Sequence, residues 1–269
     1  MSFDLEYFNL GYLDTLSYKN TFVHRLDPRI KILVSFTFIF FVVSFPKYEL
    51  SGLMPFFIYP VFLLTAGDIP LRAIAKKILF ISPFAIFVGI FNPLFDTDVL
   101  ITIFGIPVSG GWISFISIIV KFILTVSTAL LLIAVTSFPG ICEALERLKL
   151  PGIFVVQLLF LYRYLFVLLE ETLKILRARE AKSFGKKGKE VKTFIRIISV
   201  LLLRSVDRAE RIYRAMLSRG FRGEIRVLKT HRLRLQDVFF AAFSVIIFYI
   251  FRNFNLVSFI GENLKSSFR

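Results

Sequence analysis

The sequence has few of the side chains on which metal sites and many catalytic sites are built. Among 269 residues, cysteine occurs once, at Cys142, and histidine twice, at His24 and His231. A single cysteine excludes an intramolecular disulfide and a metal site made of cysteines. The two histidines flank predicted membrane segments and have no companion ligands nearby in the sequence. We therefore expect no bound metal and no cofactor.

The common nucleotide, hydrolase and zinc signatures are also missing. The chain contains no GxxxxGK[ST] loop, no GxSxG elbow, no HExxH and no paired CxxC. It offers no group of acids, histidines and metal ligands that could converge on a substrate in the cytosol, so a membrane enzyme is disfavoured. If ATP drives this protein, another chain must bind it.

Apolar and basic residues, in contrast, are abundant. Hydrophobic residues make up 56% of the chain, with 34 phenylalanines, and the formal net charge is +15. This apolar fraction exceeds that of soluble domains, so lipid must surround much of the chain. Basic residues beside membrane segments follow from the positive-inside bias and from contact with anionic lipid heads, so we expect membrane lipid and not nucleic acid as a partner.

Five segments are apolar enough to be membrane helices. They cover residues 30–45, 50–66, 71–94, 112–137 and 238–251. Asp27 can cap the first of these helices, and Pro28 suits its first turn. The first 20 residues carry acids and no apolar core, so we expect no cleavable signal peptide.

Charge sets the expected orientation. The loop over 95–111 has Asp96 and Asp98 but no lysine or arginine, and its alternating pattern predicts a small external hairpin. The segment 138–234 has 22 lysines and arginines against 9 acids and is expected in the cytoplasm. The predicted division is therefore a cytoplasmic N-terminal segment, four spans, a cytoplasmic helical region, and a last span with an external tail. Its bounds are 1–29, 30–137, 138–234 and 235–269.

One further apolar stretch, 153–169, is nearly long enough to span the membrane. It contains Gln157 and Arg163, and an arginine at mid-bilayer costs at least about 2.5 kcal/mol on insertion scales. A crossing here would also move the basic segment 170–234 outside the cell. We therefore predict a buried or interfacial helix on the cytoplasmic side.

The cytoplasmic segment is predicted to hold three helices, over 139–149, 153–183 and 190–218, and the ends of the last two repeat with an offset of 37 residues. The copies read RAREAKSF, from Arg177 to Phe184, and RAMLSRGF, from Arg214 to Phe221. Each places a cation between two small residues, followed by phenylalanine. The first tip is Ala181, Lys182, Ser183 and Phe184, and the second tip is Ser218, Arg219, Gly220 and Phe221.

Two explanations fit the tips. Cations favour helix C-termini, and Gly220 can be a C-cap. Capping requires neither the phenylalanine nor the duplication, however, so we favour a pair of docking sites for a dimer or pseudo-dimer. Arg163 and Arg204 are expected to be structural and to meet carboxylates, with Glu170, Asp207 and the pair Glu143 and Glu146 as candidates. The run Lys186-Lys187-Gly188-Lys189 is a solvated loop or touches lipid heads.

The chain resembles, over nearly its whole length, the transmembrane T component of energy-coupling-factor (ECF) transporters, the EcfT/CbiQ family. Three motifs carry the resemblance: HRLDPRIK from His24 to Lys31, including Asp27, Pro28 and Arg29; Tyr162-Arg163-Tyr164-Leu165 followed by Glu170-Glu171; and RAERIYRAM from Arg208 to Met216, leading into the second tip. The resemblance implies an all-α protein of the prokaryotic cytoplasmic (inner) membrane, with about five transmembrane helices and three cytoplasmic coupling helices.

The resemblance also implies partners and site residues. In the family, Ala-Arg-Gly-like motifs end two coupling helices, and each docks on one of two ABC-type ATPase subunits. Ser218-Arg219-Gly220 is a close match, and Ala181-Lys182-Ser183 has lysine in place of arginine, with Arg179 as a second choice for the first site. The chain would then be a non-catalytic subunit that passes ATPase motion to a substrate-binding membrane S component. The cargo would be a vitamin or a transition metal such as cobalt or nickel.

A stand-alone channel or secondary transporter is the alternative. Such a protein uses polar or ionisable groups within its spans, whereas Lys121 is nearly the only one here. We therefore favour the coupling subunit.

Overall fold

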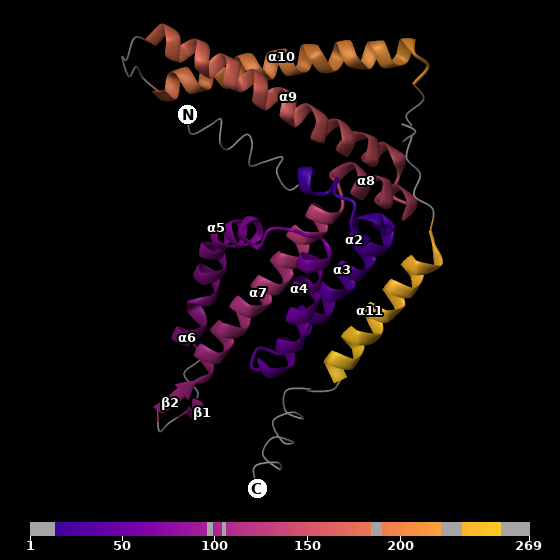
Figure 1. Ribbon diagram of the computed structural model, residues 1–269. Helices are drawn as coiled ribbons and strands as arrows, with labels where there is room; N and C mark the ends of the chain where they lie inside the picture. The colour runs from indigo at the N-terminus through magenta and orange to yellow at the C-terminus, as the bar shows by residue number, and fades with distance from the viewer. Residues whose placement is uncertain (1–13, 96–98, 104–105, 184–189, 222–232, 254–269) are drawn as a thin grey trace. The chain divides into compact units, whose positions relative to one another are not determined.

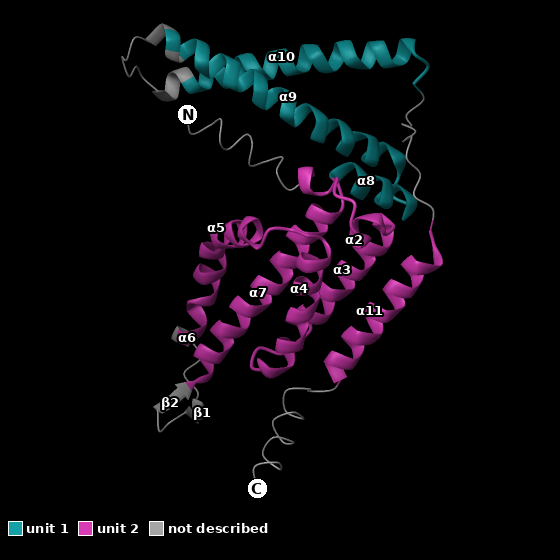
Figure 2. Ribbon diagram, viewed as in Figure 1, with its two compact units in different colours: residues 1–12, 138–230 teal, residues 13–137, 231–269 magenta. Residues whose placement is uncertain are grey.

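In the computed structural model, residues 14–95, 99–103, 106–183, 190–221 and 233–253 are described. The described chain is almost entirely helical and forms two compact units (Figure 2). One unit contains α8 (Phe138–Arg147), α9 (Gly152–Ser183) and α10 (Glu190–Ser218). The other, the membrane unit, contains α11 (Leu235–Asn253) together with the helices and strands that precede Phe138.

The membrane unit begins with the short α2 (Phe22–Arg25) and with α3 (Pro28–Val43) (Figure 1). Asp27 is the N-cap of α3, since its side chain accepts a hydrogen bond from the Arg29 amide at 2.9 Å, and Pro28 is the first helical residue. The start of this helix is therefore specified by local sequence.

The second predicted span, residues 50–66, is divided into two helices. Residues Ser51–Phe57 form a 3-10 helix, η1, and α4 (Ile58–Ala66) follows directly. Pro55 lies inside η1, where its missing N–H prevents a regular α-helical hydrogen bond. The third predicted span consists of α5 (Leu71–Gly89) and the short α6 (Phe91–Phe95).

The predicted hairpin is present. Strands β1 (Val99–Ile103) and β2 (Ile106–Ser109) pair antiparallel, with Ile103 opposite Ile106. They lead into α7 (Gly110–Val135), whose single charged residue is Lys121. The Lys121 ammonium donates to the Phe45 carbonyl just beyond the end of α3, so this cation is satisfied within the membrane unit.

Aromatic side chains fill the core of the membrane unit. The rings of Phe38, Tyr59 and Phe248 meet pairwise with centroid separations of 4.8 to 5.3 Å, and they join α3, α4 and α11. At the contact of α5 with α7, Gly89 lies so close to Phe115 that an added Cβ would come within 2.8 Å of its ring. Large side chains on the other side of α5 remain exposed, which suits contact with lipid: Leu79, Phe80, Phe84 and Phe87.

By length and composition, four helical segments could cross a membrane: Leu71–Pro93, Gly110–Val135, Gly152–Arg179 and Leu235–Asn253. The apolar segment Ser51–Ala66 is shorter, and α3 has 16 residues. Three of the four correspond to predicted spans. The fourth lies in α9, whose cytoplasmic location was expected from charge and stays a prediction.

Candidate docking surface

At the crossing of α9 and α10, a carboxylate lies between two guanidinium groups. Glu171 of α9 pairs with Arg204 at 3.0 Å and with Arg208 at 3.7 Å, both on α10. Figure 1 shows the two helices crossing, so that the C-terminal end of α9 and that of α10 lie on opposite sides of the crossing. Arg204 is thus structural, but its partner is Glu171 and not one of the acids suggested by the sequence.

The first tip lies at the C-terminal end of α9. Ala181 is exposed, and Lys182 and Ser183 are the last two residues of the helix. Phe184 and the run Lys186-Lys187-Gly188-Lys189 lie outside the described residues. The second choice, Arg179, is partly buried in the penultimate turn.

The second tip forms a closed turn at the end of α10. The Gly220 amide donates to the Leu217 carbonyl at 2.9 Å, and the Phe221 amide donates to the Met216 carbonyl at 3.0 Å. This is the Schellman pattern, and Gly220 has the left-handed φ of +78° that the pattern requires. The turn leaves the Arg219 side chain exposed to solvent.

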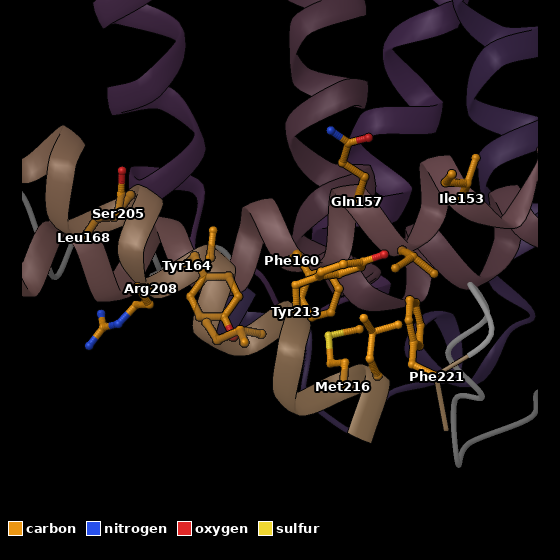
Figure 3. A pocket seen from close by; sticks show the side chains of 14 residues that line it. Ile153, Gln157, Phe160, Tyr164, Leu168, Ser205, Arg208, Tyr213, Met216 and Phe221 are labelled. Atoms are coloured by element: carbon orange, nitrogen blue, oxygen red, sulfur yellow. The ribbon is translucent and has the colours of Figure 1, made fainter. Parts of the chain in front are cut away.

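An apolar groove of about 610 Å³ lies between the N-terminal half of α9 and the C-terminal half of α10 (Figure 3). Ile153, Gln157, Phe160 and Tyr164 line it from α9, one helical turn apart. The second tip contributes Phe221, which lies with Met216 at one end of the groove, while Arg208 lies at the other. The aromatic residue of the second tip therefore continues the apolar lining.

Arg163 does not take part in an ion pair among the described residues. Its side chain is exposed, and the guanidinium lies 6.0 Å from the ring centre of Tyr164. The preceding Tyr162 turns to another face of α9 and stacks on Phe138 of α8 at 4.5 Å. Consecutive helical residues point about 100° apart, so Arg163 is directed away from this packed side. The carboxylate partner expected for Arg163 is not found in the described part of the chain.

In the membrane unit, the Asp27 motif belongs to a buried polar cluster. The Asp27 amide donates to Asp237 of α11 at 3.2 Å, and Lys31 donates to the Val135 carbonyl at the end of α7 at 2.8 Å. The Arg29 side chain lies 3.7 Å from the Asp27 carboxylate. Asp27, Lys31 and Asp237 are all at most 5% exposed. The cluster joins the start of α3, the end of α7 and the start of α11.

Sequence reasoning missed two of these residues. In the sequence, Glu171 is recognised only as the neighbour of Glu170. The repeat offset of 37 residues makes Glu171 and Arg208 equivalent positions, and this equivalence could have identified the pair. Asp237 had a weaker signal, an acid in the first turn of a membrane helix. Across the described residues, no group of three or more His, Cys, Asp or Glu side chains could hold a metal ion.

Comparison with known proteins places the chain in a family. The sequence profile of CbiQ, described as cobalt transport protein, matches residues 19–231. An uncharacterized protein of Methanocaldococcus jannaschii is 28% identical over 84% of this chain and 80% of its own length. The energy-coupling factor transporter transmembrane protein EcfT of Bacillus selenitireducens is 30% identical over 75% of this chain and 80% of its own.

A second EcfT protein, from Ruminiclostridium cellulolyticum, is 25% identical over 85% of this chain and 88% of its own length. These matches cover both the membrane unit and the paired helices. Together with the apolar spans, they identify a multi-pass protein of the cytoplasmic membrane. The chain therefore belongs to the EcfT/CbiQ family, the transmembrane components of energy-coupling-factor transporters.

Proposed function

We propose that this chain couples ATP hydrolysis by two ABC-type ATPase subunits to a substrate-binding membrane S component. The observation that carries the proposal is the pair of helices α9 and α10, which cross at Glu171 and end in related cationic tips. Two tips of like chemistry suit two like partners. The relatives named as energy-coupling factor transporter proteins support the same role.

The conformation of the second tip supports docking. The Schellman turn accounts for Gly220, but it does not require an exposed arginine at position 219 or an aromatic residue at position 221. An exposed guanidinium can pair with a carboxylate or with the carbonyls at a helix end of the partner. Arg219 would supply this polar contact and Phe221 an apolar one.

The apolar half of α9 supports a second contact. Ile153, Phe154 and Leu161 expose 67%, 57% and 59% of their surface, and most of the side chains that line the groove with α10 are apolar. Such a surface is costly in water. We propose that the S component covers it, so that movement of the ATPase pair at the tips would pass along the helices to the substrate-binding subunit.

The cargo proposed is a transition metal such as cobalt or nickel, or a vitamin. The family description, cobalt transport protein, supports the metal. Recognition of the cargo would belong to the S component, and ATP hydrolysis to the ATPases. The purified chain alone should then show neither ATPase activity nor substrate binding. Substrate binding would favour the channel or secondary transporter, and ATPase activity would favour an enzyme.

The substitution Arg219→Ala tests the docking role. It should reduce co-purification of the ATPases and substrate uptake, because the exposed guanidinium is the charged group of the second tip. Membrane insertion of the chain should be unchanged. Arg211→Ala, which removes another exposed arginine two turns earlier on α10, is the matched control and should leave the complex intact. Unchanged complex yield and uptake in Arg219→Ala would refute the docking role.

The same assay separates the two candidates for the first tip. If Lys182 is the docking cation, Lys182→Ala should lower the yield of ATPase complex and Arg179→Ala should not. The opposite result would move the first tip to Ala178-Arg179-Glu180.

A further inference from the structure

Glu171 occupies a special position in the pair of helices. Its carboxylate is the most buried member of the ion cluster: 23% of the Glu171 side chain is exposed, against 57% for Arg204 and 41% for Arg208. It pairs with two cations, and both lie on the other helix. Glu170, the neighbouring acid, pairs among the described residues with Lys174 one turn along its own helix, at 2.8 Å.

The internal repeat relates two of the residues in this contact. Glu171 and Arg208 are 37 residues apart, the same offset that relates Lys182 to Arg219. When two related elements cross about a two-fold axis, a residue on the axis meets its own equivalent. The pair of Glu171 with Arg208 meets this condition, as a local pseudo-two-fold axis through the crossing would require.

The tips are then equally far from the axis. Lys182 follows Glu171 by 11 residues, and Arg219 follows Arg208 by 11 residues. Both intervals are helical up to Ser183 and Ser218, so each arm is about 16 Å long at 1.5 Å per residue. With Arg179 as the first docking residue, the arms would differ by three residues, or about one turn.

We infer that Glu171 is a positioning residue that fixes the crossing of α9 and α10, so that the two tips lie at equal distances from a pseudo-two-fold axis. The partner that this arrangement fits is a pair of equivalent surfaces related by two-fold symmetry. The identity of that partner as an ATPase pair rests on the proposed function, whereas the role of Glu171 does not.

Spin labels at the tips test the inference on the full chain without any partner. The labels are placed on cysteines at the exposed, repeat-related positions Ala181 and Ser218, with the buried Cys142 replaced by serine. Two arms of about 16 Å put the labels roughly 30 Å apart at most, a separation that pulsed electron paramagnetic resonance can measure. The unaltered crossing should give one narrow distance distribution.

Glu171→Gln should broaden this distribution, because the amide cannot hold two guanidinium groups. Glu170→Gln, which removes the neighbouring exposed acid, is the matched control and should leave it narrow. Circular dichroism should show the same helix content in both variants. A distribution that stays narrow in Glu171→Gln would overturn the inference, even if the ATPases still dock.

Exchange of the charges tests the two-fold relation. Glu171→Arg combined with Arg208→Glu moves the carboxylate to position 208 of α10, one turn from Arg204. There the carboxylate can face the new guanidinium at position 171 across the crossing. The narrow distribution should return. A broad distribution in the exchanged protein would show that the pair does not lie on an axis. Failure here concerns the crossing alone, while failure of the Arg219→Ala experiment concerns docking.

Discussion

Gly220 and Lys149 occupy the same position in two turns of the same kind. At the end of α8, the Lys149 amide donates to the Glu146 carbonyl and the Leu150 amide to the Leu145 carbonyl, which is the pattern seen at Gly220. Lys149 accordingly has a positive φ of 72°. Glycine adopts this conformation without the steric cost that a Cβ imposes.

This comparison predicts opposite effects of two substitutions. Gly220→Ala should destabilise the end of α10 by about 1 kcal/mol, and Lys149→Gly should stabilise the end of α8 by a similar amount. Space is not the cause at Gly220, since a Cβ there would have no neighbour within 4 Å. Hydrogen exchange of the last-turn amides measures both effects. Gly152→Ala, also without a neighbour within 4 Å, is the control.

His24 makes the stability of the membrane unit depend on pH. Burial lowers the pKa of His24 below its ordinary value of 6.5, and the nearby charge of Lys31 lowers it further. Its Nε2 donates to the Leu16 carbonyl at 3.1 Å, and Nδ1 accepts from the Thr21 hydroxyl at 2.7 Å, an arrangement that suits the neutral ring. The folded chain therefore binds a proton less readily than the unfolded chain.

The sign of the effect follows. Above pH 6.5 the ring is neutral in both states, and as the pH falls through 6.5 the unfolded chain takes up the proton first, so stability decreases. Thermal unfolding measured at about pH 7.5 and about pH 5.5 should show this loss, and His24→Asn should remove part of it. An equal loss in the variant would assign the effect to other groups.

At the scale of elements, Asp237 connects α11 to α3. Its carboxylate accepts from the Arg234 amide at 2.8 Å, as in a capping box, and from the Asp27 amide at 3.2 Å. Both atoms of the carboxylate are thus used. Asp237→Ala should leave the Asp27 amide buried without an acceptor.

We expect Asp237→Ala to lower the free energy of unfolding by about 2 kcal/mol. Glu210→Ala, which breaks an exposed ion pair with Arg214 on one face of α10, should change it by less than about 1 kcal/mol. Denaturant titration in detergent compares the two. Equal effects would mean that Asp237 contributes no more than a surface charge.

The sequence predicts elements well where local rules determine them. Asp27 and Pro28 mark the start of α3, and the predicted helix over 190–218 has the bounds of α10. It predicts less where tertiary contacts decide. The division into η1 and α4 depends on Pro55 in its packed setting, and the partner of Arg204 depends on the crossing of two helices.

For the candidate site, the repeat identified both tips but not the crossing. The tips are local motifs, which a sequence comparison detects directly. The pairing of Glu171 with Arg208 needs the two helices to be placed against each other, and only then does the repeat offset become a contact. That Arg163 has no carboxylate partner in the described part of the chain likewise depends on which face of α9 is packed.

In the whole molecule, the buried polar cluster lies where the chain leaves and re-enters the membrane unit. Lys31 donates to the carbonyl of Val135. This residue lies two positions before Ser137, after which the chain leaves the membrane unit. Asp237, which the Asp27 amide contacts, follows the return at His231 by six. If the paired helices exert force through the chain, as proposed, the membrane unit would receive it at this hydrogen-bonded cluster.

Transmission of this kind requires both tips on the same side of the membrane. Length and composition alone would allow Gly152–Arg179 to cross. A crossing would place Arg163 within the lipid and would separate the first tip from the short helix α8 by a bilayer, against the charge bias of the segment. The ion cluster of Glu171 and the exposed arginines of α10 instead suit water.

Single cysteines at Ala181 and Ser218, in a chain with Cys142→Ser, distinguish the two topologies. Both should react with a membrane-impermeant maleimide in inverted vesicles and neither in intact cells, because both tips are expected in the cytoplasm. A cysteine at Asp96, in the loop that lacks lysine and arginine, should react in intact cells and serves as the external reference. Labelling of both Ala181 and Ser218 in intact cells would make α9 a span and would leave neither tip available to a cytoplasmic partner.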